Sequence, residues 1–152
     1  MAQRLSADNS GLSIEKACGV NVMEWLLDIA FGLDHKASML PETTKPPYRT
    51  VHCVYYQFAE KSGRICSLNG YSDLDPDQFQ VSFLAHEGTY VDQYRMITKI
   101  VFNADSGKEM CEKIKYLNSK VRVLNEQGEN MYIMYTDYDY LIEAHKGLFL
   151  HE

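Results

Sequence analysis

The strongest limit on the possible folds of this chain is a series of short strand-like segments that starts near Tyr48. β-Branched and aromatic residues dominate these segments, and turn-forming residues such as Gly, Asn, Asp and Pro separate them. The predicted strands cover residues 50–58, 64–68, 79–84, 96–103, 120–124 and 131–135. Strands that follow one another with few helices between them are typical of antiparallel pairing. The sequence therefore predicts an α+β fold with a mainly antiparallel sheet and flanking helices.

Two helices are predicted before the strands. The first covers residues 12–18, and the side chain of Ser10 is placed to cap it. The second starts after Asn21, which forms a capping-box pattern with Glu24. Apolar residues then recur at helical spacing as far as Gly32, where this helix is expected to end.

Two further helices are predicted among and after the strands. An amphipathic helix follows residues 104–106, and residues 137–148 fit a final helix. The apolar face of the first of these is formed by Met110, Cys111, Ile114 and Leu117.

The stretch from residue 34 to residue 47 separates the early helices from the strands. It contains three prolines and no regular hydrophobic period, so we predict an exposed linker or loop. The chain is therefore expected to divide into two parts. Residues 1–47 form a helical part with the linker, and residues 48–152 form the antiparallel α+β part.

Composition limits the classes of function. The 152 residues, with 45% hydrophobic content, suit one compact domain or a short arm plus one domain. A formal net charge of -6 argues against broad nucleic-acid binding, which needs a basic surface. No apolar run approaches the roughly 20 residues that span a bilayer, and the N-terminus lacks the apolar core of a signal peptide. We therefore expect a cytoplasmic protein with no membrane partner.

The cysteines and histidines give weak signals for chemistry. Four cysteines occur without CxxC spacing, and we interpret them as free thiols that pack as small hydrophobic residues: Cys18, Cys53, Cys66 and Cys111. His52 lies inside a predicted strand, where a structural role is the simpler interpretation. The adjacent His86 and Glu87 allow an acid–base pair as a minority hypothesis.

No metal site is predicted in this chain. Asp73, Asp75 and Asp77 alternate like the start of a calcium loop. The glycine and the terminal glutamate of that loop are missing from their required positions, so a turn is the better interpretation.

Four short segments carry a resemblance to a known family through their order and spacing along the chain. They are residues 18–24 (C-G-V-N-V-M-E), 27–32 (L-D-I-A-F-G), 62–65 (S-G-R-I) and 88–91 (G-T-Y-V). In this order they resemble the C-terminal part of the ATP-grasp carboxylate–amine ligases. That family includes biotin carboxylase, the carboxylases and formyltransferases of purine synthesis, and the large subunit of carbamoyl phosphate synthase.

The family's own patterns show how far this resemblance extends. They are a T-G-V-D-L-x-E helix start, an L-x-L-A-x-G helix end, a hairpin turn with a Gly-[Arg/Lys]-Ile step, and a later P-G-x-x-V. Asn69 and Gly70 follow the hairpin here, and Glu87 stands in place of the proline. The resemblance runs from about Arg4 to Leu124. It implies the C-terminal, lid-like part of an ATP-grasp fold.

The resemblance implies an activity for a parent enzyme and none for this chain alone. ATP-grasp ligases activate a carboxylate as an acyl phosphate for attack by an amine, and their ATP- and Mg²⁺-binding groups precede the region matched here. We therefore expect ATP and Mg²⁺ as cofactors of the parent enzyme and no cofactor in this chain. The expected partner is the N-terminal ATP-grasp portion of the same or an adjacent gene product.

Arg4 is the site residue that the resemblance implies. It matches the arginine of the family's E-x-N-x-R segment, whose role is contact with an anionic substrate or phosphate, although Ala2 stands at the asparagine position. Ser6, Asn9 and Ser10 precede a predicted helix, where free amides can bind an anionic substrate. Simple capping of that helix explains the same three residues.

Two other interpretations stay open. The chain can be a stand-alone, non-catalytic α+β module for protein association or small-ligand regulation, with its tyrosine-rich sheet as the interface. A small-molecule enzyme that uses His86 and Glu87 is the third and weakest hypothesis. A homo-oligomer is compatible with any of these functions.

Overall fold

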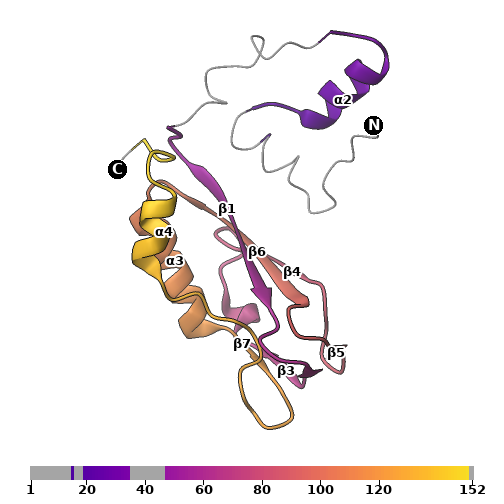
Figure 1. Ribbon diagram of the computed structural model, residues 1–152, viewed down its shortest axis with the longest axis vertical. Coiled ribbons are helices and arrows are strands. Elements are labelled where there is room, and N and C mark those ends of the chain that lie inside the picture. The colour runs from indigo at the N-terminus through magenta and orange to yellow at the C-terminus, as the bar shows by residue number, and fades with distance from the viewer. Residues whose placement is uncertain (1–14, 16–18, 35–46, 151–152) are drawn as a thin grey trace.

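The computed structural model describes residues 15, 19–34 and 47–150 (Figure 1). Its helices and strands are, in chain order, α2 (Val22–Ala30), β1 (Val51–Phe58), β2 (Gly63–Arg64), β3 (Ser67–Asn69), the 3-10 turn η3 (Tyr71–Asp73), β4 (Gln80–Phe83), β5 (Tyr90–Val91), β6 (Met96–Ala104), α3 (Gly107–Lys120), β7 (Arg122–Leu124) and α4 (Tyr138–Ala144). Every pairing between these strands is antiparallel, which confirms the predicted α+β class with a mainly antiparallel sheet. The division into residues 1–47 and 48–152 stays a prediction.

β6 is the central strand of the three-stranded sheet, whose order is β1-β6-β4. Its sequence, M-I-T-K-I-V-F-N-A, is rich in β-branched and apolar residues, and most of its side chains are buried. β1 pairs along it from Val51 opposite Ala104 to Phe58 opposite Met96, with a register shift after Gln57. β1 and β4 are therefore the outer strands of this sheet.

α3 and α4 pack against each other on one side of the sheet (Figure 1). α3 begins after Ser106, whose hydroxyl oxygen accepts a hydrogen bond of 3.1 Å from the backbone N–H of Glu109. The predicted apolar face of this helix is buried, as its four residues show: Met110, Cys111, Ile114 and Leu117. Together with Ile97 and Ile100 of β6, these side chains form much of the hydrophobic core.

The predicted strand over residues 64–68 is wrong as one element. β2 pairs with β5, whereas β3 pairs with β7, so the chain changes its partner at Ile65 and Cys66. The Ile65 N–H donates to the Thr89 carbonyl at 2.9 Å, and the Cys66 N–H donates to the Leu124 carbonyl at 2.8 Å. The sequence shows one continuous β-like run because both partners lie far away along the chain.

The C-terminal elements are shorter than predicted. Residues 131–135 contain one isolated bridge instead of a strand, and it joins Tyr132 to Ala59. The predicted helix over residues 137–148 is α4, which ends at Ala144. Three residues after this end, Gly147 has a positive φ of 83°, which a continued right-handed helix would not allow.

α2 begins and ends as predicted. The Asn21 side chain accepts a hydrogen bond of 3.0 Å from the Glu24 N–H, and Gly32 has a φ of 84° just after the helix. None of its residues is buried against the described part of the chain, although most of them are apolar. Phe31 is 82% exposed. A helix that is apolar on most of its surface is normally covered, so α2 presents an apolar surface for contact.

Candidate functional site

The site residues implied by the sequence lie outside the described residues. Arg4, Ser6, Asn9 and Ser10 all belong to this group, as does the predicted helix over residues 12–18 apart from Glu15. The site that the structure does describe is a pocket at β1.

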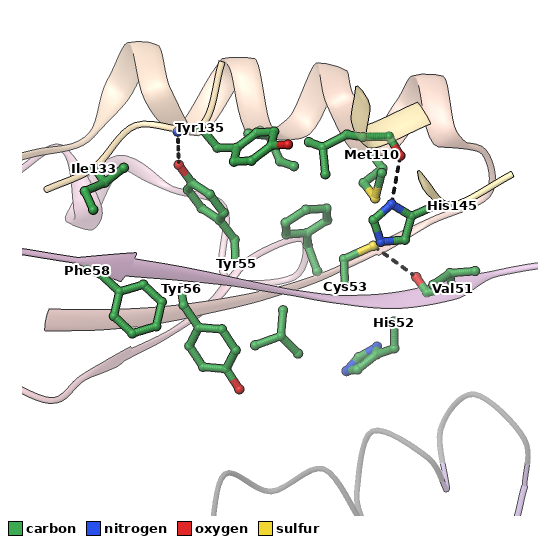
Figure 2. A pocket seen from close by; sticks show the side chains of 14 residues that line it. Val51, His52, Cys53, Tyr55, Tyr56, Phe58, Met110, Ile133, Tyr135 and His145 are labelled. Atoms are coloured by element: carbon green, nitrogen blue, oxygen red, sulfur yellow. Dashed lines mark hydrogen bonds between the residues drawn. The ribbon is translucent and has the colours of Figure 1, made fainter. Parts of the chain in front are cut away.

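This pocket has a volume of about 450 Å³ and lies between β1, α3, α4 and the segment before α4 (Figure 2). Its fourteen lining residues include no Asp, Glu, Lys or Arg: Val51, His52, Cys53, Val54, Tyr55, Tyr56, Phe58, Phe102, Met110, Ile114, Ile133, Tyr135, Leu141 and His145. Such a lining favours an apolar occupant, since it contains no carboxylate, ammonium or guanidinium group that could pair with an ion.

Both faces of β1 contribute to the pocket. Cys53 and Tyr55 point toward the helices, whereas His52, Tyr56 and Phe58 point to the opposite side of the strand (Figure 2). Successive side chains of a strand alternate between its two faces. A pocket lined by both sets therefore runs along the outer edge of β1, on the side away from β6.

Tyr55 fixes the wall of the pocket next to α3. Its hydroxyl donates to the Asn118 side-chain oxygen at 2.8 Å and accepts a hydrogen bond of 3.4 Å from the Tyr135 N–H. Asn118 also donates to the Tyr135 carbonyl at 2.8 Å. These bonds hold the segment before α4 against β1, which keeps the pocket in shape without a charged group.

The other end of the pocket carries an imidazole and a thiol. Nδ1 of His145 lies 2.8 Å from the Leu141 carbonyl, so Nδ1 carries the proton in this hydrogen bond. The Cys53 thiol lies 3.7 Å from the Val51 carbonyl. Burial raises the pKa of the Cys53 thiol to about 12. The thiol is therefore protonated at neutral pH and suited to packing, because the thiolate is the nucleophilic form.

The prediction that the cysteines are free thiols holds for Cys53, Cys66 and Cys111, but they differ in exposure. Cys111 is buried, and burial raises its pKa, whereas Cys66 is exposed. The expectation that each packs as a buried residue is wrong for Cys66, because the chain changes its pairing partner there.

We expect iodoacetamide at about pH 8 to label Cys66 at least roughly tenfold faster than Cys53, since access and thiolate content both control the rate. Mass spectrometry of the proteolytic peptides measures the two rates. In urea, where burial is lost, the two rates should converge. Equal labelling in the folded state would contradict the burial of the Cys53 thiol.

The histidine and acidic candidates from the sequence make contacts within the fold. The Glu87 carboxylate accepts a hydrogen bond of 2.9 Å from the Leu68 N–H, and the His86 ring lies 6.2 Å from the Phe83 ring. His52 is hydrogen-bonded across the strand pair to Asn103. No group of three or more His, Cys, Asp and Glu suited to a metal occurs among the described residues.

The acidic alternation from Asp73 to Asp77 forms a turn, as predicted. The Asp75 carboxylate accepts hydrogen bonds from the Asp77 N–H at 3.0 Å and from the Gln78 side chain at 2.8 Å. Both bonds are local, which is typical of an Asx turn.

A second polar cluster lies in the core near the pocket. The Gln57 side chain is fully buried, and its oxygen accepts hydrogen bonds from the Tyr71 hydroxyl at 2.6 Å and from the Thr98 hydroxyl. Burial raises the pKa of Tyr71, and it raises the pKa of Tyr132 to about 12. Both tyrosines are thus held neutral in the folded state.

The buried tyrosines make stability fall at high pH. Tyrosine in the unfolded chain ionises near pH 10, whereas Tyr132 stays neutral until about pH 12, so its stabilisation is complete below pH 10 and is lost above it. Urea unfolding from about pH 9 to about pH 11.5 measures the loss. Tyr132→Phe should reduce this loss by on the order of 2 kcal/mol. Tyr90→Phe, at a site 61% exposed, should leave it unchanged. Equal curves for wild type and Tyr132→Phe would contradict the shift.

The pocket was not predicted from the sequence. Tyr55, Tyr135 and His145 come from segments up to 90 residues apart, and nothing in their local patterns joins them. The one usable signal was the apolar and aromatic character of residues 51–58 on both faces of the strand.

No protein-family model matches the chain, and no curated protein matches its sequence. Among the described residues, no helix is long and apolar enough to cross a membrane.

Proposed function

We propose that this chain is the C-terminal part of an ATP-grasp carboxylate–amine ligase or of a carbamoyl phosphate synthase-like protein, and that it is inactive alone. The observation that carries the proposal is the pairing of β2 with β5. Two of the segments that resemble the family, residues 62–65 and 88–91, meet in this pairing although they lie far apart in the sequence.

The contacts of this pairing involve the residues that carry the resemblance. Gly63 lies opposite Val91, and Arg64 lies opposite Tyr90. The Gly88 N–H donates to the Ile65 carbonyl at 2.7 Å, and the Arg64 guanidinium donates to the Gly88 carbonyl. A Cβ on Gly63 would lie 3.1 Å from the terminal carbon of Met131, so a small residue suits this position.

The apolar surface of α2 gives independent support. In the proposed parent enzyme, this helix packs against the catalytic region, which explains its apolar composition and its lack of cover within the described residues. The exposed apolar side chains that would lie in that contact are Met23, Leu27, Ile29, Phe31 and Leu33.

The proposal gives the chain a positioning role. The N-terminal ATP-grasp portion binds ATP and Mg²⁺, and this chain forms a wall of the site that orients the acyl acceptor. Arg4 contacts an anionic substrate or phosphate in the assembled enzyme, with Ser6, Asn9 and Ser10 next to it.

Isothermal titration with Mg-ATP tests whether the chain lacks a nucleotide site of its own, and no binding to the 152-residue chain is expected. Tight binding of Mg-ATP would contradict the proposal.

The catalytic portion, from the same or an adjacent gene, should bind the chain through α2. Phe31→Asp should then weaken that binding at least about tenfold. Leu84→Asp, at an exposed site of the α+β part, is the matched control.

The second candidate function is a stand-alone module for protein association. The exposed α2 and the uncharged pocket at β1 favour it. The genomic sequence upstream of Met1 discriminates between the two candidates. An ATP-grasp core encoded there supports the ligase, whereas a start site with no such neighbour supports the module.

A further inference from the structure

The outer edge of β1 exposes main-chain hydrogen-bonding groups along the pocket. The Phe58 carbonyl accepts a hydrogen bond of 2.9 Å from the Ile133 N–H, so Phe58 directs its main-chain groups away from β6. Alternate residues of a strand direct these groups to the same edge. His52 and Val54 therefore present their N–H and C=O groups outward.

Both ends of this edge are already occupied by strand-like segments of the same chain. At one end, Tyr132 forms an antiparallel bridge with Ala59. At the other end, the Tyr48 N–H donates to the Leu148 carbonyl at 2.6 Å, and the Leu150 N–H donates to the Tyr48 carbonyl at 2.8 Å. The fold thus already pairs extended segments with this edge, and it does so on either side of a gap.

The gap between these two paired ends forms a slot of limited length along the outer edge of β1. Within the described residues, no hydrogen-bond partner meets the outward main-chain groups of His52 and Val54. The slot runs from about residue 51 to residue 55, which corresponds to roughly 14 Å at the rise of a strand. The edge carries no Lys, Asp, Glu or Pro within β1, which are the residues that commonly protect an exposed edge.

We propose that this slot binds a short extended segment of another polypeptide by β-strand addition. The segment pairs with the outward groups of His52 and Val54 and places one apolar side chain in the pocket below α4. A length of about four or five residues fits the slot. This inference does not depend on an ATP-grasp origin of the chain.

The boundaries of the slot argue against a second copy of this chain as the occupant. Symmetric pairing of two copies along the whole of β1 would need an open edge from Val51 to Phe58. The Ile133 N–H already bonds to Phe58, and residues 148–150 occupy the same edge just before the strand. A short segment that turns away at both ends avoids these blocks. The absence of charge in the lining selects apolar side chains over acidic or basic ones.

The test is an NMR titration of the ¹⁵N-labelled full chain with the blocked peptide acetyl-Thr-Leu-Thr-Leu-Thr-amide. We expect saturable shifts of the His52 and Val54 amides, and smaller shifts of the Cys53 and Tyr55 amides, which face β6. The same peptide with all five residues N-methylated should not bind, since it retains the side chains but cannot donate main-chain hydrogen bonds.

Two variants of the chain complete the design. Val54→Pro removes one outward N–H from an edge position, where proline is tolerated, and should weaken peptide binding at least about fivefold. Val54→Thr keeps the N–H and should change the affinity less than about twofold. Equal binding of the N-methylated peptide, or shifts centred away from β1, would overturn the proposal. So would the absence of any saturable shift, or a dimer in sedimentation that Val54→Pro abolishes.

Discussion

Replacing Gly70 with alanine should destabilise the fold by about 4 kcal/mol or more. Gly70 joins β3 to η3 with a φ of 79°, a conformation that L-residues other than glycine adopt at a cost. A Cβ at this position would lie 2.1 Å from the Lys120 carbonyl oxygen and 2.9 Å from its carbonyl carbon. Both atoms belong to the backbone at the end of α3, so relief requires the helix end and β3 to separate.

Gly128→Ala is the matched control for this change. Gly128 has a φ of 74°, but a Cβ there meets nothing within 4 Å. This substitution should therefore lower the free energy of unfolding by only about 1 kcal/mol, which is the effect of the positive φ alone. Urea unfolding followed by circular dichroism measures both values. Equal losses for the two variants would contradict the close approach of Gly70 to Lys120.

Leu117→Ala should cost about 3 to 4 kcal/mol, because it leaves a cavity in the core. Leu117 lies on the face of α3 that is turned to the core, and its side chain is fully buried. The surrounding core is built from both α3 and β6, so its backbone cannot readily close around a missing side chain.

Leu84→Ala provides the comparison for the same deletion at the surface. Leu84 follows β4 and is 57% exposed, so its truncation should change the free energy of unfolding by less than about 1 kcal/mol. The same urea unfolding experiment applies. A small loss at Leu117 would mean that α3 does not pack against the sheet as described.

Local sequence patterns were sufficient to predict the helices and strands that are determined by residues close together in the chain. β6 was predicted at residues 96–103 and ends one residue later, because its apolar run needs no distant information. The start of α2 followed from Asn21 and Glu24, since the capping bond joins residues three positions apart. The buried face of α3 followed from helical spacing for the same reason.

Features that depend on distant partners were not predictable in this way. The run over residues 64–68 became two strands because Ile65 and Cys66 bond to segments near Thr89 and Leu124. The slot at β1 required knowledge that Ile133 and Leu148 pair with the same edge, and these residues lie far from it in the sequence. Hydrophobic periodicity reports which face of a strand is covered, but not which segment covers its edge.

The resemblance to ATP-grasp ligases and the geometry of β2 and β5 lead to one direct test. The 152-residue chain is combined with the proposed partner, an ATP-grasp portion from the same or an adjacent gene, and ATP hydrolysis is measured with candidate carboxylates and amines. We expect hydrolysis that depends on both substrates in the mixture, at least about a hundredfold above either component alone. An ATP-grasp portion that is equally active without the chain, or a chain that hydrolyses ATP alone, would contradict the proposed function.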